Sequence, residues 1–224
     1  MSSIEHGLPP VIFRDAHLLA LDKPPGMPVQ PDRTGDRSLL ELVRAAFPAV
    51  EVGSPHRLDR PVSGVTLFTL DAGTLRHMDA CFRERTVAKN YLAIVEGRTS
   101  GEGELRHALG HAGGTRKARV GEGTPNAALS YRTMAAGDRY SLLEVTPQGG
   151  AFHQIRAQLA AWGHAIKGDV KYGARRKEPD RSIALHAWRM RFPHPATGAV
   201  LEIEAKVPER SIWPVLWAMR SVTG

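Results

Sequence analysis

The alternation of apolar and polar positions predicts a chain in which short strands outnumber helices. Residues 11–13 and 18–22 are apolar runs on either side of a turn at 14–16, and residues 64–70 form a longer apolar run. Apolar runs of this length between turn-forming residues are typical of strands. By the same criterion, strands are expected over residues 89–95, 127–134, 140–145, 183–192 and 200–206.

Helical spacing is clearest after Ser38. Leucine, valine and phenylalanine recur every three to four residues over 39–47, and Ser38 with Glu41 predicts a capping box. A second helix is expected over 72–84. Pro208 is expected to open a C-terminal helix that Pro214 kinks or restarts.

Residues 152–162 predict a further helix. Its apolar arc is expected to contain Phe152, Ile155, Leu159 and Trp162. Arg156 borders this arc rather than opposing it, so its guanidinium is expected to reach a buried acid.

Strands with helices inserted between them favour an α+β protein built on a mixed, largely antiparallel sheet. Residues 97–125, which are rich in glycine, histidine and charge, are expected to form loops or a small hairpin. With 224 residues, 42% of them hydrophobic, the chain can bury a sizeable core. Since no repeat, low-complexity tract or linker stands out, residues 1–224 are treated as a single domain.

Charge and cysteine content narrow the class of protein. A formal net charge of +7 favours an anionic partner such as RNA or DNA, and no expected helix is basic on one face and apolar on the other, as membrane binding requires. The single cysteine, Cys81, excludes a disulfide within the chain and a thiolate-cluster metal site; it is expected to fill the core. The first ten residues are polar and no apolar run is long enough to span a bilayer, so the cytoplasm is the expected location.

The stretch from His56 to Gly64 carries the most informative chemistry. It places Asp59 between Arg57 and Arg60 among turn-forming residues. Guanidinium neighbours favour the ionised form of a carboxyl group, and they also suit phosphate. The segment is therefore either a nucleophile or base beside phosphate-binding charge, or an ordinary surface turn with a local Arg–Asp pair.

A metal site is not expected. His107 and His111 have the spacing of two ligands on one helix face, but the glycines around them disfavour a helix and no third ligand follows at a telling distance.

Five segments resemble, in the same order, the motifs of the RluA family of RNA pseudouridine synthases. The resemblance covers nearly the whole chain. The segments are 22–29 (DKPPGMPV), 56–64 (HRLDRPVSG), 89–97 (KNYLAIVEG), 153–156 (HQIR) with 168–169 and 172–173, and 185–187 with 192–198.

The resemblance implies a role for five residues. It makes Asp59 the catalytic residue and Arg57 the side chain that fills the space left when the target uridine is flipped out of its stack. Tyr91 is expected to stack on the uracil, Ile155 to contact the base, and Arg156 to pair with the catalytic carboxylate. The implied fold is a mixed sheet split into two halves with the active cleft between them.

The implied reaction converts uridine to pseudouridine in structured RNA, either ribosomal or transfer RNA. It detaches uracil and rejoins it through carbon 5, so nothing is oxidised and no cofactor is expected. The aspartate attacks the ribose anomeric carbon, attacks the uracil ring, or removes a ribose proton; the sequence does not choose among these routes. Arg60, Lys89 and Lys171 are candidates for contacts with the RNA backbone, and the protein is expected to be a monomer.

The chain departs from the family pattern at two positions, and two other functions are compatible with part of the sequence. Relatives often carry Gly-Arg where this chain has Gly150-Ala151, and threonine where it has Val62. The separate N-terminal RNA-binding domain of many members is not expected here. The main alternative is a non-catalytic RNA-binding protein on the same fold. A glycosidic-bond hydrolase is a further alternative, but such enzymes usually need two cooperating carboxylates.

Overall fold

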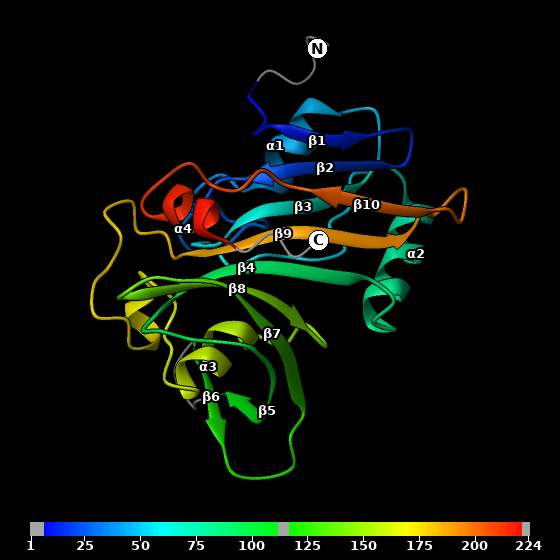
Figure 1. Ribbon diagram of the computed structural model, residues 1–224. Helices are drawn as coiled ribbons and strands as arrows, with labels where there is room; N and C mark the ends of the chain where they lie inside the picture. The colour runs from blue at the N-terminus through cyan, green and yellow to red at the C-terminus, as the bar shows by residue number, and fades with distance from the viewer. Residues whose placement is uncertain (1–6, 112–116, 221–224) are drawn as a thin grey trace. The chain divides into compact units, whose positions relative to one another are not determined.

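The computed structural model describes residues 7–111 and 117–220, in which ten strands and four α-helices form a mixed α+β structure (Figure 1). Within the described residues, the pairs β1–β2, β2–β3, β9–β10, β4–β8, β5–β6, β5–β7 and β7–β8 are antiparallel; the bounds of these strands follow. The chain divides into two compact units. Unit 1 comprises Met1–Lys89 and Ala187–Lys206, and unit 2 comprises Asn90–His186 and Val207–Gly224. That the whole chain is one domain stays a prediction.

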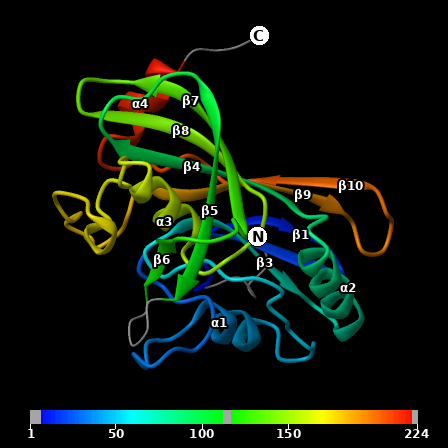
Figure 2. The same ribbon diagram turned by 90° about the horizontal axis from the view of Figure 1, so that it is seen from below.

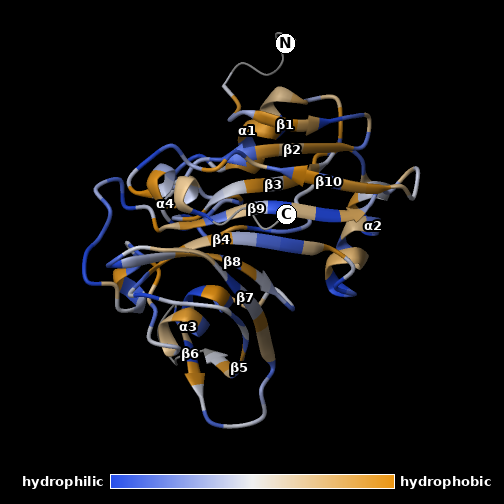
Figure 3. Cartoon of the chain, viewed as in Figure 1, coloured by the Kyte–Doolittle hydropathy of each residue, from blue (hydrophilic) through white to orange (hydrophobic). Residues whose placement is uncertain are grey.

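Unit 1 is built on strands in the order β1-β2-β3-β9, with β10 paired to β9. Leu18 to Leu21 of β2 are fully buried, and Figure 3 shows hydrophobic residues along β1 and β2. The expected strands near residues 11, 18, 64, 183 and 200 are therefore confirmed. Their bounds are β1 Val11–Arg14, β2 Leu18–Lys23, β3 Ser63–Thr69, β9 Leu185–Pro193 and β10 Val200–Glu204.

Two helices complete unit 1. Helix α1 (Leu39–Ala46) begins with the predicted capping box: Ser38 Oγ accepts from the Glu41 N–H at 3.3 Å, and Glu41 Oε2 accepts from the Ser38 N–H at 2.8 Å. Helix α2 (Ala72–Arg83) begins after Asp71, whose Oδ1 accepts from the Thr74 N–H at 2.7 Å. In each helix, one first-turn N–H group that has no partner within the helix is therefore satisfied by a side chain.

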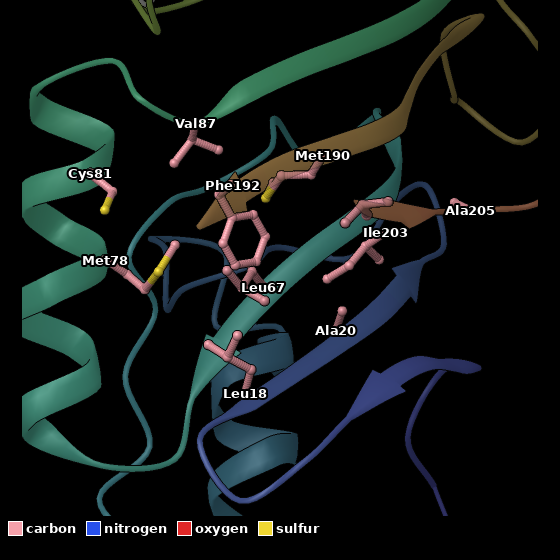
Figure 4. Packing of buried hydrophobic residues seen from close by; sticks show 11 residues of the cluster. Leu18, Ala20, Leu67, Met78, Cys81, Val87, Met190, Phe192, Ile203 and Ala205 are labelled. Carbon is pink, nitrogen blue, oxygen red and sulfur yellow. The ribbon is translucent and has the colours of Figure 1, made fainter. Parts of the chain in front are cut away.

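The core of unit 1 lies between α2 and the sheet. Figure 4 shows Met78 and Cys81 of α2 pointing towards Leu67 on β3 and Phe192 on β9. Burial of each large apolar side chain contributes roughly 1.5–3 kcal/mol, so this cluster holds the helix on the sheet. Cys81 is a buried, free cysteine within this cluster, as expected.

Gly64 permits close packing of β3 in unit 1. Its φ is +111°, and a Cβ added there would lie 2.2 Å from the backbone oxygen of Ala187. No other residue fits that space without moving the backbone. Gly64 also pairs with Lys23, the last residue of β2.

Unit 2 contains strands in the order β4-β8-β7-β5-β6. The strand predictions near residues 89, 127 and 140 are confirmed. The expectation for residues 97–125 is only partly right, because β5 pairs with β7 over six residue pairs as a member of the sheet, in addition to forming a hairpin with β6. Residues 112–116 lie outside the described residues. The strand bounds are β4 Ala88–Glu96, β5 Glu102–His111, β6 Ala118–Gly121, β7 Ala127–Ala136 and β8 Tyr140–Pro147.

The helices of unit 2 begin later than predicted. Helix α3 (Gln154–Ala161) contacts β5, β6 and β8, and α4 (Trp213–Met219) contacts β7 and β8 (Figure 2). His153 has φ +53°, so the helix cannot extend back to Phe152, which is 37% exposed instead of lying in an apolar arc. Pro208 does not open α4; Pro214 lies in its first turn, where a missing N–H costs nothing.

Across residues 7–111 and 117–220, none of the helices has the length and apolarity needed to cross a bilayer.

Candidate active site

Asp59 lies in a turn whose two ends are anchored in unit 1. The Val62 N–H donates to the Asp59 carbonyl at 3.0 Å, and the side chains of Leu58 and Val62 are buried. Asp59 itself is half-buried and Arg57 is exposed. Buried side chains thus hold the turn in place, while Arg57 and Asp59 are left accessible, as is usual for site residues on a loop.

Lys23 holds this turn, although its place in the sequence indicated no role for it. Lys23 is 0% exposed, and its Nζ donates to the carbonyl oxygens of Pro24 at 2.9 Å, Met27 at 2.8 Å and Arg60 at 3.2 Å. The Gly26 N–H donates to the same Arg60 oxygen at 2.8 Å. The segments 22–29 and 56–64, which the resemblance singled out separately, are therefore joined at Arg60.

Burial lowers the pKa of Lys23 from 10.5 to about 7. The negative charge of Asp59 opposes this change and the positive charge of Arg60 adds to it. The only sequence signal for such a site was a lysine that follows an apolar strand directly and precedes two prolines.

Arg60, a predicted RNA-backbone contact, braces a neighbouring loop. Its Nε donates to the Gly26 carbonyl at 2.7 Å and its Nη1 to Thr34 Oγ1 at 2.7 Å. Its guanidinium also pairs with Asp36 and, at 3.6 Å, with Asp32. These carboxylates offset its charge, and a contact from Arg60 to RNA phosphate stays a prediction.

His56 packs inside unit 1. Its Nε2 accepts from the Leu67 N–H at 2.9 Å and its ring stacks on Phe82 at 5.0 Å between centroids. Burial, followed by the positive charge of Lys89, lowers the pKa of His56 to about 3. A neutral imidazole that accepts a backbone hydrogen bond fixes the start of the 56–64 segment to β3.

Lys89 and Tyr91 lie near the start of β4, both half-buried. Figure 3 shows a hydrophilic band on β4. Burial and the charge of Arg85 lower the pKa of Lys89. Asn90, between them, points to the other face of the strand, where its Nδ2 donates to Glu144 Oε1 at 3.1 Å and Thr146 Oγ1 at 3.0 Å. The alternation of a strand therefore gives Lys89 and Tyr91 the same face.

In unit 2, Arg156 reaches a buried acid, as expected, and that acid is Asp169. Its Nε donates to Asp169 Oδ2 at 2.7 Å and its Nη2 to Oδ1 at 2.9 Å. Arg156 is 5% exposed and Asp169 2%. The fork-to-fork geometry fixes the plane of the guanidinium by charge-assisted hydrogen bonds. Ile155, its neighbour in the first turn of α3, is buried.

Tyr172 is the second residue that holds Arg156. The guanidinium carbon of Arg156 lies 5.0 Å from the centroid of the Tyr172 ring. The Tyr172 hydroxyl accepts from the Ala118 N–H at 2.8 Å and hydrogen-bonds His153 Nδ1 at 2.7 Å. Tyr172 ends the short 3-10 helix η2 (Val170–Tyr172), which also carries the exposed Lys171. The Gly-Asp and Tyr-Gly pairs of the sequence thus supply the support of Arg156.

A cavity of about 610 Å³ in unit 2 lies apart from these residues. Its lining includes Glu144 and Thr146, the partners of Asn90, and no predicted site residue. Three glutamates against one arginine make it unsuited to phosphate. It is lined by Glu102, Gly103, Glu104, Ser130, Tyr131, Arg132, Glu144 and Thr146.

Asp59 and Arg57 belong to unit 1, whereas Tyr91, Ile155 and Arg156 belong to unit 2. The pairing of Asp59 with Arg156 and the stacking of Tyr91 on uracil stay predictions. Among residues 7–111 and 117–220, no three His, Cys, Asp or Glu side chains are arranged to hold a metal ion.

Comparison with known families decides the class of protein. Residues 17–161 match the family described as RNA pseudouridylate synthase, and this range contains Asp59, Tyr91 and Arg156. The chain belongs to this family of RNA-modifying enzymes. The resemblance to the RluA family is thereby confirmed.

Curated relatives carry related names. The chain is 32% identical to an uncharacterized RNA pseudouridine synthase of Bacillus subtilis over 91% of its length, and 33% identical to ribosomal large subunit pseudouridine synthase C of Escherichia coli over 89%. It spans 70% and 66% of those two proteins, about two thirds of each. It is also 31% identical to tRNA pseudouridine synthase C of Haemophilus ducreyi, covering 92% of this chain and 93% of the relative.

Solved structures agree on the fold. The human protein RNA pseudouridylate synthase domain containing 1 is 25% identical and superposes with a TM-score of 0.75, over 99% of this chain and 90% of its own. The human protein RNA pseudouridylate synthase domain containing 4 is 22% identical and superposes with a TM-score of 0.70, over 89% of this chain and 88% of its own. The prediction of an α+β fold with a mixed, largely antiparallel sheet is confirmed.

Proposed function

We propose that this chain isomerises specific uridines to pseudouridine in ribosomal or transfer RNA, with Asp59 as the catalytic residue. The observation that carries the proposal is the family match over residues 17–161, which includes the Asp59 segment. Relatives named for ribosomal and for transfer RNA support both substrate classes. The proposed compartment is the cytoplasm, where both kinds of RNA are found, and the proposed state is a monomer.

The target uridine is flipped from its stack to meet Asp59. Flipping costs a few kcal/mol, and stacking on Tyr91 repays roughly 1–3 kcal/mol of that cost. Arg57, which is exposed, fills the space the base leaves, and Ile155 borders the base. Each of these contacts favours the extruded nucleotide over the stacked one.

Arg156 keeps the catalytic carboxylate ionised and oriented. A guanidinium carries five N–H donors, of which Asp169 accepts two. A positive charge held rigidly by Asp169 and Tyr172 stabilises an anion beside it without the entropic cost of ordering a mobile side chain. All three starting routes, through the anomeric carbon, the uracil ring or a ribose proton, need an ionised aspartate.

Lys23 and Asp36 assist in unit 1 by fixing the backbone and side chain of Arg60, next to Asp59. Arg60, Lys89 and Lys171 supply positive charge for the RNA backbone. The reaction gains and loses no atoms, so the proposal requires no cofactor.

The test is pseudouridine mapping in ribosomal and transfer RNA transcripts of the host, incubated with the wild-type chain, Asp59→Asn, or Asp79→Asn. Asp79 is exposed on α2 and serves as the matched control. Turnover by Asp59→Asn is expected to fall at least about 10³-fold, as on loss of a catalytic group, while RNA binding is kept. The Asp79→Asn variant is expected to match the wild type.

Three outcomes would overturn the proposal in different ways. RNA binding by the wild-type chain without pseudouridine formation favours the non-catalytic RNA-binding protein. Release of free uracil in stoichiometric amount favours a hydrolase. Unchanged turnover by Asp59→Asn removes Asp59 from the chemistry while leaving the family activity in place.

A further inference from the structure

An exposed aromatic ring precedes the helix that carries Arg156. Phe152 lies two residues before α3 and is 37% exposed. Its ring stacks on that of His153, with 3.8 Å between centroids and 18° between planes. A large apolar side chain is thus held in solvent with its ring plane set by a second ring.

The second ring is itself fixed. His153 has φ +53°, a left-handed conformation that residues with a side chain rarely adopt. Its Nδ1 is hydrogen-bonded to the Tyr172 hydroxyl at 2.7 Å, and that hydroxyl is tied to the Ala118 N–H. Tyr172 is buried, so the stacked pair rests on the core of unit 2.

The same support holds the proposed partner of the catalytic acid. Arg156 lies 5.0 Å from the Tyr172 ring centroid, and the Nζ of Lys117 lies 5.0 Å from the same centroid. Contacts therefore run without a break from Phe152 through His153 and Tyr172 to Arg156. The exposed ring is thus tied to the residues that position Arg156, and an exposed aromatic ring is a platform on which an unpaired base can stack.

The position before Phe152 carries a small, uncharged side chain. Gly150 and an exposed Ala151 stand directly before Phe152. Ala151 therefore offers no positive charge near the start of α3, and the exposed aromatic ring of Phe152 comes directly after it. A ring binds a base through its face, whereas an arginine binds phosphate through its charge, so the two contacts respond differently to salt.

We propose that Phe152, supported by His153, stacks on an unpaired base next to the target uridine in the RNA. The proposal rests on the proposed function, because it places the base beside the uridine bound near Ile155 and Arg156. Stacking accepts any base, so Phe152 adds affinity for an open loop rather than for a sequence.

The test compares wild-type protein with Phe152→Leu, which removes the ring but keeps an apolar side chain, and Phe152→Trp, which keeps a ring. Met219→Leu, at an exposed apolar residue of α4, is the matched control. The probe is a pool of RNA stem-loops with a random loop, and binding is measured over a series of salt concentrations. Quenching of 2-aminopurine placed at each loop position in turn reports stacking directly.

Loss of one stacked base is expected to weaken binding by Phe152→Leu about 5- to 150-fold, with the slope of log affinity against log salt unchanged. Phe152→Trp and Met219→Leu are expected to bind within about threefold of wild type. Quenching at a loop position is expected to vanish with Phe152→Leu alone.

Equal binding and equal quenching by wild type and Phe152→Leu would overturn the stacking role and point to a protein partner for Phe152. Weaker binding with a changed salt slope would also overturn it, because the ring would then act through nearby charges. Failure of the wild-type protein to bind any of the pool would overturn the proposed function and the stacking proposal together, which separates the two results.

Discussion

Each unit of this protein buries a cation in or next to the proposed site, Lys23 in unit 1 and Arg156 in unit 2, and the two are held by different chemistry. In unit 1, Lys23 is fully buried and its amine donates to three backbone carbonyls. In unit 2, Arg156 is 5% exposed and donates twice to the carboxylate of Asp169. Carbonyl oxygens offer dipoles, whereas a carboxylate offers a full opposite charge.

Because of this difference, Lys23 is able to change its charge near neutral pH, whereas Arg156 is not. Burial without a hydrogen-bonded carboxylate lowers the pKa of Lys23 to about 7, so this amine titrates near neutral pH. A guanidinium stays protonated throughout this range. The positive charge of Arg156 is therefore constant across this range, whereas Lys23 ties the Asp59 turn to segment 22–29.

Removing the carboxylate in unit 2 should have the largest effect on stability. Asp169→Ala or Asp169→Asn leaves the buried guanidinium without its two charge-assisted hydrogen bonds, and the free energy of unfolding is expected to fall by about 3–5 kcal/mol. Chemical denaturation measures this change. Asp138→Asn, at an exposed acid of the same unit, is expected to change it by less than about 0.5 kcal/mol. A loss no larger than that of the control would show that Asp169 does not hold Arg156.

Removing the amine in unit 1 should cost less and should alter the response to pH. Lys23→Met leaves buried carbonyls without a donor, which is expected to lower the free energy of unfolding by about 1–3 kcal/mol. In the wild type, between pH 7 and 10.5, the unfolded chain binds a proton at Lys23 that the folded chain does not. Stability contributed by Lys23 therefore rises with pH across this window.

The measurement for Lys23 is unfolding at a series of pH values for the wild type, Lys23→Met and Lys206→Met, an exposed lysine of unit 1. The wild type and Lys206→Met are expected to gain stability relative to Lys23→Met between pH 7 and 10.5. Parallel curves for all three proteins would mean that the pKa of Lys23 is not lowered.

Removing the side-chain cap of helix α2 is expected to have the smallest effect on the free energy of unfolding. Helix α2 of unit 1 begins with Asp71 as a side-chain cap, whereas α3 of unit 2 begins with His153 and has no side-chain cap. Asp71→Ala is expected to lower the free energy of unfolding by about 1 kcal/mol. Hydrogen bonds from the Thr74 hydroxyl and N–H lower the pKa of Asp71 to about 2, so its contribution is present above pH 3.8 and lost as pH falls towards 2.

Thermal and chemical unfolding of Asp71→Ala at pH 7 and near pH 2 check this effect, with Asp79→Ala on the same helix as control. Equal stability of both variants and the wild type at pH 7 would contradict the capping role. A difference that persists unchanged near pH 2 would show that the charge of Asp71 is not its cause.

Much of the fold was predictable because local patterns decide it. The capping box at Ser38 and the apolar run after Gly64 each determine an element from neighbouring residues alone. The predictions that failed depended on distant contacts. Residues 97–125 contain a sheet strand, β5, which pairs with β7. Phe152 stays outside α3 because His153, whose ring hydrogen-bonds Tyr172, has a left-handed backbone conformation.

By itself the sequence determined the family, the order of the motifs and the residues proposed for catalysis, since each motif is a contiguous run that is recognisable without its surroundings. It also indicated that Arg156 reaches a buried acid. Only the tertiary structure decided that this acid is Asp169 and that Lys23 secures the Asp59 turn. The physical reason is that hydrogen bonds and buried charges are paired in space, between residues that lie 13 and 37 positions apart along the chain, and no local pattern records which partner is chosen.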